Sequence, residues 1–196
     1  MSTAAELTFD AEFHEYRVAG ERWPSVTDVL DPLQELDGIL RPVLKAAASF
    51  GSHVHQACHL FNVGQLDEAA LDPHLAPYLA GWKQLLSDTA AVVVASERRV
   101  MHPKLHFAGT LDAIVNWKGK RFLVDIKTSA DVPRTAGPQT AAYREAYLQE
   151  ELVCAPLRYC AHLRADGTYR LVPLADPRDW SYFLSALNLW NWRNRR

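Results

Sequence analysis

The sequence predicts a mixed α/β domain of the α+β kind, in which a mixed central sheet is flanked by helices. Its 196 residues are enough for one well-packed domain. Apolar residues make up 48% and charged residues 22%, a globular balance that excludes disorder. Helical spacing dominates the first 90 residues, whereas β-branched and aromatic runs typical of strands begin at Val92. Because no repeat or low-complexity linker divides the chain, we expect a single domain over residues 1–196.

The first 90 residues are predicted to form a short hairpin and three helices that pack on the rest of the domain. Ala19-Gly20 lies in the middle of a loosely alternating segment, which is typical of a hairpin turn. We expect the hairpin over 7–23 and the helices over 24–33, 41–61 and 77–86. The longest helix is expected to be interrupted or bent near Gly51, with an inward face made of Phe50, Val54, Cys58 and Phe61.

Residues 91–175 are predicted to form the core of the domain. Strands are expected over 92–101, 107–117 and 121–128, followed by a helix over 139–151. A hairpin over 157–174 follows. The last helix, within 176–196, is expected to begin at Asp176-Pro177, because an aspartate cap followed by proline favours a helix start.

Charge is divided unevenly along the chain, although the net charge is only −2. The first 90 residues hold 5 Lys/Arg against 13 Asp/Glu, and the remainder holds 16 Lys/Arg against 10 Asp/Glu. Such asymmetry is a hint of nucleic-acid contact through the basic half, and chance clustering on solvated faces explains it equally well.

The cysteines and the apolar runs give expectations about the compartment. Three cysteines without CxxC spacing argue against a disulfide framework and favour a reducing, cytoplasmic location. The chain lacks 18 uninterrupted apolar residues, so no membrane span or membrane partner is expected. Residues 1–10 do not have the pattern of a signal peptide.

Two aspartates are predicted to face each other across the central hairpin. Asp125 and Lys127 share one face of their strand, because side chains alternate along a strand. If Lys118-Gly119 is a two-residue turn, Asp112 lies directly opposite Asp125, with Cβ atoms roughly 4.5–5.5 Å apart.

Facing carboxylates repel, and a divalent cation is the usual reason to tolerate them. We therefore expect each aspartate to raise the pKa of the other in the metal-free protein. The alternative interpretation is a solvated hairpin edge at which Lys127 merely neutralises one aspartate.

These residues resemble a known family. Gly109-Thr110-Leu111-Asp112 followed by Val124-Asp125-Ile126-Lys127-Thr128 is similar to the PD-(D/E)XK core of RecB-type nucleases. Flanking motifs match the same group in the same order, and the resemblance covers most of residues 9–150. The flanking matches are the upstream helical motif at Gly51-Ser52-His53-Val54-His55, an acidic residue of the first core strand at Glu97, and a QxxxY motif from Gln139 to Tyr143. The opening, from Phe9 through Pro24-Ser25-Val26-Thr27, is similar to phage-encoded members.

The resemblance implies a restriction-endonuclease-like core that binds Mg²⁺, for which Mn²⁺ substitutes. The implied metal ligands are His55, Glu97, Asp112, Asp125 and the backbone carbonyl of Ile126. Asp112, Asp125 and Lys127 are the implied catalytic residues. Gln139 and Tyr143, which share a helix face, are expected to reach DNA phosphate or to brace the lysine. No iron–sulfur cluster is expected, because the three cysteines stand in the wrong places for one.

The implied function is a Mg²⁺-dependent DNA nuclease, of the phage exonuclease type, acting in recombination or DNA processing. By analogy with ring-forming exonucleases, a homo-oligomer is expected. A recombination partner such as a single-strand annealing protein and a location in the host cytoplasm would follow if the chain is phage-encoded.

Two other functions are compatible with the sequence. One is a catalytically silent PD-(D/E)XK domain that only binds DNA, although the intact Asp112, Asp125 and Lys127 argue against it. The other is a zinc protein that uses a histidine-rich cluster on one helix. The members of that cluster would be His53, His55, Cys58 and His59.

Overall fold

The structure is a computed structural model that describes residues 6–10, 12–33, 41–151 and 153–194. Its centre is a five-stranded mixed sheet in the order β4-β5-β6-β7-β8, in which only the β6–β7 pair is parallel. This confirms the predicted mixed α/β class, and each strand ends within about two residues of its expected bounds. The strands are β4 (Val92–His102), β5 (Phe107–Trp117), β6 (Lys120–Lys127), β7 (Leu157–Leu163) and β8 (Tyr169–Pro173).

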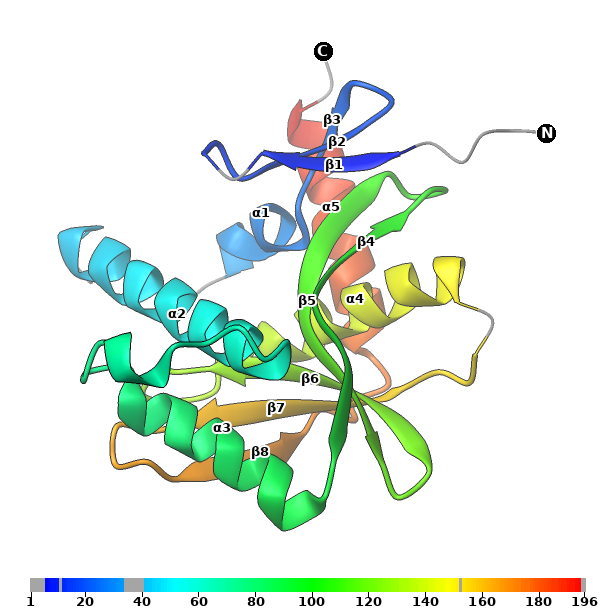
Figure 1. The fold of residues 1–196 in the computed structure, drawn as a ribbon. Helices are drawn as coiled ribbons and strands as arrows, with labels where there is room; N and C mark the ends of the chain where they lie inside the picture. The colour runs from blue at the N-terminus through cyan, green and yellow to red at the C-terminus, as the bar shows by residue number, and fades with distance from the viewer. Residues whose placement is uncertain (1–5, 11, 34–40, 152, 195–196) are drawn as a thin grey trace.

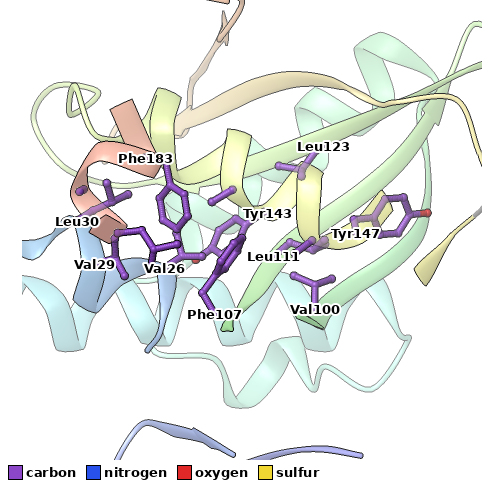
Figure 2. Close-up of a cluster of buried hydrophobic side chains, with 14 of the residues drawn as sticks. Val26, Val29, Leu30, Val100, Phe107, Leu111, Leu123, Tyr143, Tyr147 and Phe183 are labelled. Atoms are coloured by element: carbon purple, nitrogen blue, oxygen red, sulfur yellow. The ribbon is translucent and has the colours of Figure 1, made fainter. Parts of the chain in front are cut away.

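Helices cover both faces of this sheet (Figure 1). One face is covered by α2 (Arg41–Asn62) and α3 (Ala76–Thr89), which share an apolar cluster with β5, β6 and β7. The other face is covered by α1 (Val26–Leu30), α4 (Ala136–Glu150) and α5 (Asp179–Asn194), whose cluster is drawn in Figure 2. The short 3-10 turns Asp31–Leu33 and Glu68–Ala70 complete the helical segments. Within the described residues, no helix is both long and apolar enough to cross a bilayer.

The β4–β5 hairpin extends beyond the rest of the sheet. Paired residues of β5 and β6 run from Trp117 and Lys120 to Ala113 and Val124, whereas β5 stays paired with β4 as far as Phe107. Figure 1 shows this hairpin curving away from β6 towards the small N-terminal sheet. The last residues of β6 therefore have no β5 backbone opposite them, which leaves their outer edge available to side chains.

The N-terminal segment forms three strands, so the single hairpin predicted over 7–23 is wrong. The turn at Ala19-Gly20 joins β2 (Glu15–Val18) to β3 (Glu21–Trp23) as expected, and β1 (Leu7–Asp10) pairs with β2 before it. The extra reversal begins at Asp10, whose carboxylate accepts hydrogen bonds from two backbone N–H groups after it. An aspartate that bonds its own chain in this way mimics a turn.

Helix α2 runs without interruption through Gly51, contrary to the expected break. Strong formers before the glycine and burial of one face after it outweigh the roughly 1 kcal/mol that a single glycine costs. The predicted inward face is confirmed, because Val54 and Cys58 are buried while Phe50 and Phe61 pack against the same cluster.

Helix α4 begins at Ala136, three residues before the expected start at Gln139. Pro138 lies in the first turn, where a backbone N–H has no partner within the helix and its loss costs little. The last helix begins at Asp179 and not at Asp176. The Asp176 carboxylate instead accepts from the N–H of Arg178 and closes a turn ahead of the helix.

A buried ion pair ties the beginnings of α4 and α5 to β7. Arg158 Nη2 lies 3.0 Å from Asp179 Oδ2, and both side chains are less than a tenth exposed. Arg158 Nη1 also donates to the carbonyl of Gly137 at 2.7 Å and to Thr140 Oγ1 at 3.2 Å. A Cβ at Gly137 would lie 2.5 Å from an Asp179 oxygen, so only glycine allows this approach. The pair fixes the N-terminal turn of α4 relative to the sheet.

Removing one partner of this pair should destabilise the protein strongly. The variant Asp179→Ala leaves the Arg158 guanidinium buried without its counter-charge, which costs about 3 kcal/mol or more. Urea unfolding followed by circular dichroism measures the loss. The exposed Asp131 is the matched control, and Asp131→Ala should change stability by less than about 0.5 kcal/mol. Similar small losses for both variants would contradict the structural role.

Candidate metal centre

Three carboxylates lie in a row across neighbouring strands. The β4–β5 register pairs Ser96 with Ala113 and Arg98 with Leu111, so Glu97 falls opposite Asp112. On the other side, the β5–β6 register confirms the predicted Lys118-Gly119 turn and continues to the pair Ala113–Val124. The ladder ends there, one pair short of Asp112 and Asp125. The predicted register is therefore correct, but Asp112 and Asp125 are not a ladder pair.

Beyond the last β5–β6 backbone pair, the side chain of Asp112 makes the contact with β6. Its Oδ2 accepts a hydrogen bond of 2.6 Å from the N–H of Ile126, and its Oδ1 lies 3.2 Å from Nδ1 of His55. Burial alone would raise the pKa of this carboxyl, yet the charge of His55, with help from Lys127 and the Ile126 N–H, holds it below its usual value. The expectation that each aspartate raises the pKa of the other is thus wrong for Asp112, because it has its own cation.

His55 reaches the centre from α2. Burial would lower the pKa of its imidazole, but the negative charge of Asp112 outweighs this and raises it to about 9. Glu97 Oε1 lies 3.9 Å from the same nitrogen. Among the described residues, His55, Glu97 and Asp112 form the only group of three side chains whose potential ligand atoms all lie within 4.8 Å of one another. The predicted ligands His55 and Glu97 are therefore confirmed as neighbours of Asp112.

Glu97 has an unusual backbone. Its φ of 49° lies in the left-handed region, in the middle of a strand and on a residue that is not glycine. A residue in this conformation is strained, and such strain persists only where surrounding contacts impose it. Burial and the neighbouring charge of Asp112 raise the pKa of the Glu97 carboxyl to about 7.

Asp125 is compensated less fully than Asp112. It is 1% exposed, and neither of its oxygens has a hydrogen-bond partner in the structure. Lys127 Nζ lies 2.8 Å from Oδ2, an ion-pair contact whose angles do not satisfy a hydrogen bond. Burial raises the pKa of Asp125 to about 6; the charge of Lys127 opposes this shift and that of Asp112 reinforces it. A buried carboxylate with unused oxygens fits a cation-binding role.

Lys127 stays charged beside these acids. Burial would lower the pKa of its ammonium group, but the charges of Asp125 and Asp112 raise it above its usual value. Ile126, between the two, donates its N–H towards Asp112. The carbonyl of a strand residue points to the same side as its N–H, so the Ile126 carbonyl faces the edge that β5 has left. The carbonyl predicted as a ligand thus lies on the side of β6 that faces Asp112.

The two residues predicted on α4 lie next to each other. Gln139 Nε2 donates to Tyr143 Oη at 3.2 Å, and the buried Tyr143 has a pKa raised by burial and by the charges of Asp112 and Asp125. Its ring packs directly on Gly109, where a Cβ would lie 2.5 Å from the Tyr143 ring. The glycine of the Gly-Thr-Leu-Asp motif therefore admits the tyrosine of the downstream motif.

Sequence reasoning did not identify several residues that support the centre. Tyr16 Oη shares a hydrogen bond of 2.7 Å with Thr110 Oγ1, which attaches the N-terminal sheet two residues before Asp112. Ser96 and Asn62 hydrogen-bond beside Glu97. No local pattern marks these residues, because each acts through a partner that is distant in sequence.

The histidine-rich segment of α2 does not gather into one site. His59 Nδ1 lies 3.0 Å from Ser96 Oγ, and Cys58 is buried in the apolar cluster with its thiol pKa raised to about 12 by burial. His53 lines a separate cavity of about 620 Å³ together with Phe50 and Tyr78. Only His55 of these four belongs to the carboxylate group described above.

Comparisons with known proteins give little support to any assignment. No family model and no curated protein sequence matches the chain. A crystal structure titled as that of SSO0001 is 15% identical over 85% of this chain and 75% of that chain, with a TM-score of 0.41. A likeness this distant carries no argument about function, which must come from the site itself.

The two aspartates should respond oppositely to neutralisation in EDTA. Asp125→Asn removes a buried charge that stays unfavourable even beside Lys127, as the raised pKa of Asp125 shows, so the melting temperature should rise by about 2–4 °C for each kcal/mol of relieved repulsion. Asp112→Asn should lower it, because His55 loses its counter-charge and Ile126 loses a charged acceptor. Differential scanning calorimetry measures both shifts.

The pH dependence of the Asp125→Asn effect follows from the raised pKa. Asp125 binds its proton more tightly in the folded state, because its pKa rises from the ordinary 3.8 to about 6. Its destabilising effect is therefore absent below about pH 4 and complete above about pH 6. The gain in melting temperature should shrink as the pH falls from 7 to 5, and a gain independent of pH would contradict this assignment.

Proposed function

We propose that this chain is a divalent-cation-dependent nuclease with a PD-(D/E)XK, restriction-endonuclease-like core that hydrolyses phosphodiester bonds of DNA. The observation that carries the proposal is the buried carboxylate of Asp125, which lies beside Lys127 and close enough to Asp112 and His55 of the His55–Glu97–Asp112 group for their charges to shift its pKa. A purely structural ion pair with Lys127 would account for Oδ2 but would leave Oδ1 buried without a partner.

The donor set favours a hard cation. Asp112, Asp125, Glu97 and the Ile126 carbonyl supply oxygen atoms, and His55 supplies one nitrogen. Oxygen-rich sets of this kind suit Mg²⁺ and Mn²⁺. When bound, such an ion supplies a water of lowered pKa and offsets the negative charge of a phosphate.

The residues of the chain supply the remaining parts of the reaction. Lys127 is charged, half-buried and held 2.8 Å from Asp125, so it can orient the attacking water and stabilise the negative charge that grows on the phosphate oxygens. Gln139 and Tyr143 place an amide and a hydroxyl near the two aspartates, where they can donate to a DNA phosphate. The basic second half of the chain suits contact with the DNA backbone.

Exonuclease activity in recombination or DNA processing is the specific form of this proposal. It includes a homo-oligomer that encloses DNA and an interaction with a single-strand annealing protein. Incubation with linear and with circular DNA separates exonuclease from endonuclease activity, since only a free end admits an exonuclease. Light scattering shows whether the active species is an oligomer.

Cleavage of a labelled duplex should need a divalent ion and the side chains of Asp112, Asp125 and Lys127. Wild type should cleave with Mg²⁺ or Mn²⁺ and not in excess EDTA, and Asp112→Asn and Asp125→Asn should lose at least about a hundredfold in rate. Undiminished cleavage by Asp112→Asn, or by wild type in EDTA, would contradict the mechanism.

Lys127→Ala should separate cation binding from the chemical step. Lysine is not a ligand, so calorimetric Mn²⁺ titration should still show binding while cleavage is lost. Binding of DNA should be largely retained, because most of that affinity comes from phosphate contacts elsewhere. A wild type that binds DNA and the cation but never cleaves would favour a catalytically silent DNA-binding domain.

Two histidines on α2 provide a matched pair of variants that tests which of them binds the metal. His55→Ala should weaken Mn²⁺ binding by about tenfold or more, because His55 lies 3.2 Å from Asp112. His53→Ala removes the same chemical group from the separate cavity and should leave the affinity unchanged. Equal losses, together with zinc in the purified protein by elemental analysis, would favour the zinc alternative.

A further inference from the structure

A chain of hydrogen bonds connects the buried centre of α3 to β4 beside Glu97. Trp82 Nε1 donates to Asn62 Oδ1 at 2.8 Å, and Asn62 Nδ2 donates to Ser96 Oγ at 3.0 Å. Because an indole N–H can only donate, it fixes the orientation of the Asn62 amide, with its NH₂ group towards Ser96. The Ser96 hydroxyl keeps its own proton, and Nδ1 of His59 lies within reach at 3.0 Å. The β4 backbone is thus attached to α2 and α3 at Ser96.

The residue on the other side of Glu97 is also attached to a helix. Arg98 lies 3.2 Å from Glu150 and 2.8 Å from Glu151, at the end of α4. Glu97 therefore lies between two residues that are held from opposite faces of the sheet. Its left-handed φ of 49° is a strained backbone conformation that lies between these two attachments.

The attachment at Ser96 is the more rigid of the two. Trp82 is fully buried, so the chain of hydrogen bonds begins in the apolar core. The ion pairs of Arg98 are about a third exposed and are weakened by water and salt. The position of the Glu97 carboxylate is therefore determined mainly from the α2 and α3 side.

We propose that the hydrogen-bond chain Trp82–Asn62–Ser96 positions Glu97 as a ligand for the divalent cation. Ser96 and Asn62 are positioning residues, which act through Glu97 and do not touch the cation. The inference rests on the proposed metal centre. Partners that orient a ligand contribute to metal affinity although they lie outside the coordination sphere.

The test is calorimetric titration of the full chain with Mn²⁺ alone. Ser96→Ala should weaken binding about tenfold, whereas Ser96→Thr, which keeps the hydroxyl, should bind like wild type. Asn62→Ala breaks the same series of hydrogen bonds at its middle and should weaken Mn²⁺ binding to a similar extent. The matched control is Ser52→Ala, because the exposed Ser52 hydroxyl bonds only a carbonyl of its own helix. This control should leave the affinity unchanged.

A double-mutant cycle separates positioning from a general loss of structure. In a Glu97→Gln background, Ser96→Ala should cause no further loss of Mn²⁺ affinity, because the residue through which it acts is already altered. An equal tenfold loss in both backgrounds, or none in the wild-type background, would overturn the inference while leaving the metal centre intact. A wild type that binds no Mn²⁺ would overturn the proposed function, and the inference with it.

Discussion

The carboxylate of Asp112 is the contact on which the site depends. One of its oxygens accepts the N–H of Ile126 and so closes the gap where β5 leaves β6, and the other lies against His55 of α2. A single side chain thereby connects two strands and a helix at a point where no backbone pairing exists. Because a charged acceptor forms short, strong hydrogen bonds, this contact holds the end of β6, and with it Asp125 and Lys127, in place.

The two aspartates have different electrostatic surroundings despite their closeness. Asp112 has a histidine and a backbone donor, which hold its pKa down, whereas Asp125 has one lysine in a poorly aligned contact and an elevated pKa. Paired acids with separated pKa values are typical of sites at which charge is used for binding or chemistry. The raised pKa of Asp125 means that ionising this carboxyl costs stability in the folded protein.

The rest of the architecture supports this centre from both faces of the sheet. The Arg158–Asp179 pair fixes the start of α4, which carries Gln139 and Tyr143, and Gly109 lets the Tyr143 ring pack on β5. On the opposite face, α2 supplies His55 and the hydrogen bonds that end at Ser96. The strained backbone of Glu97 lies between residues that contact these two layers.

The sequence by itself determined the features that depend on neighbours in the chain. Alternation, apolar spacing and the Lys118-Gly119 turn were enough to predict the central strands, the buried face of α2 and the register that brings Asp112 near Asp125. Local signals failed where a nearby side chain competed with them, as the turns formed by Asp10 and Asp176 show. Only the tertiary structure decided which aspartate is better compensated, which residue of β4 is strained and which histidine joins the carboxylates. Those outcomes depend on burial and on contacts between residues far apart in the chain, and no short stretch of sequence records either.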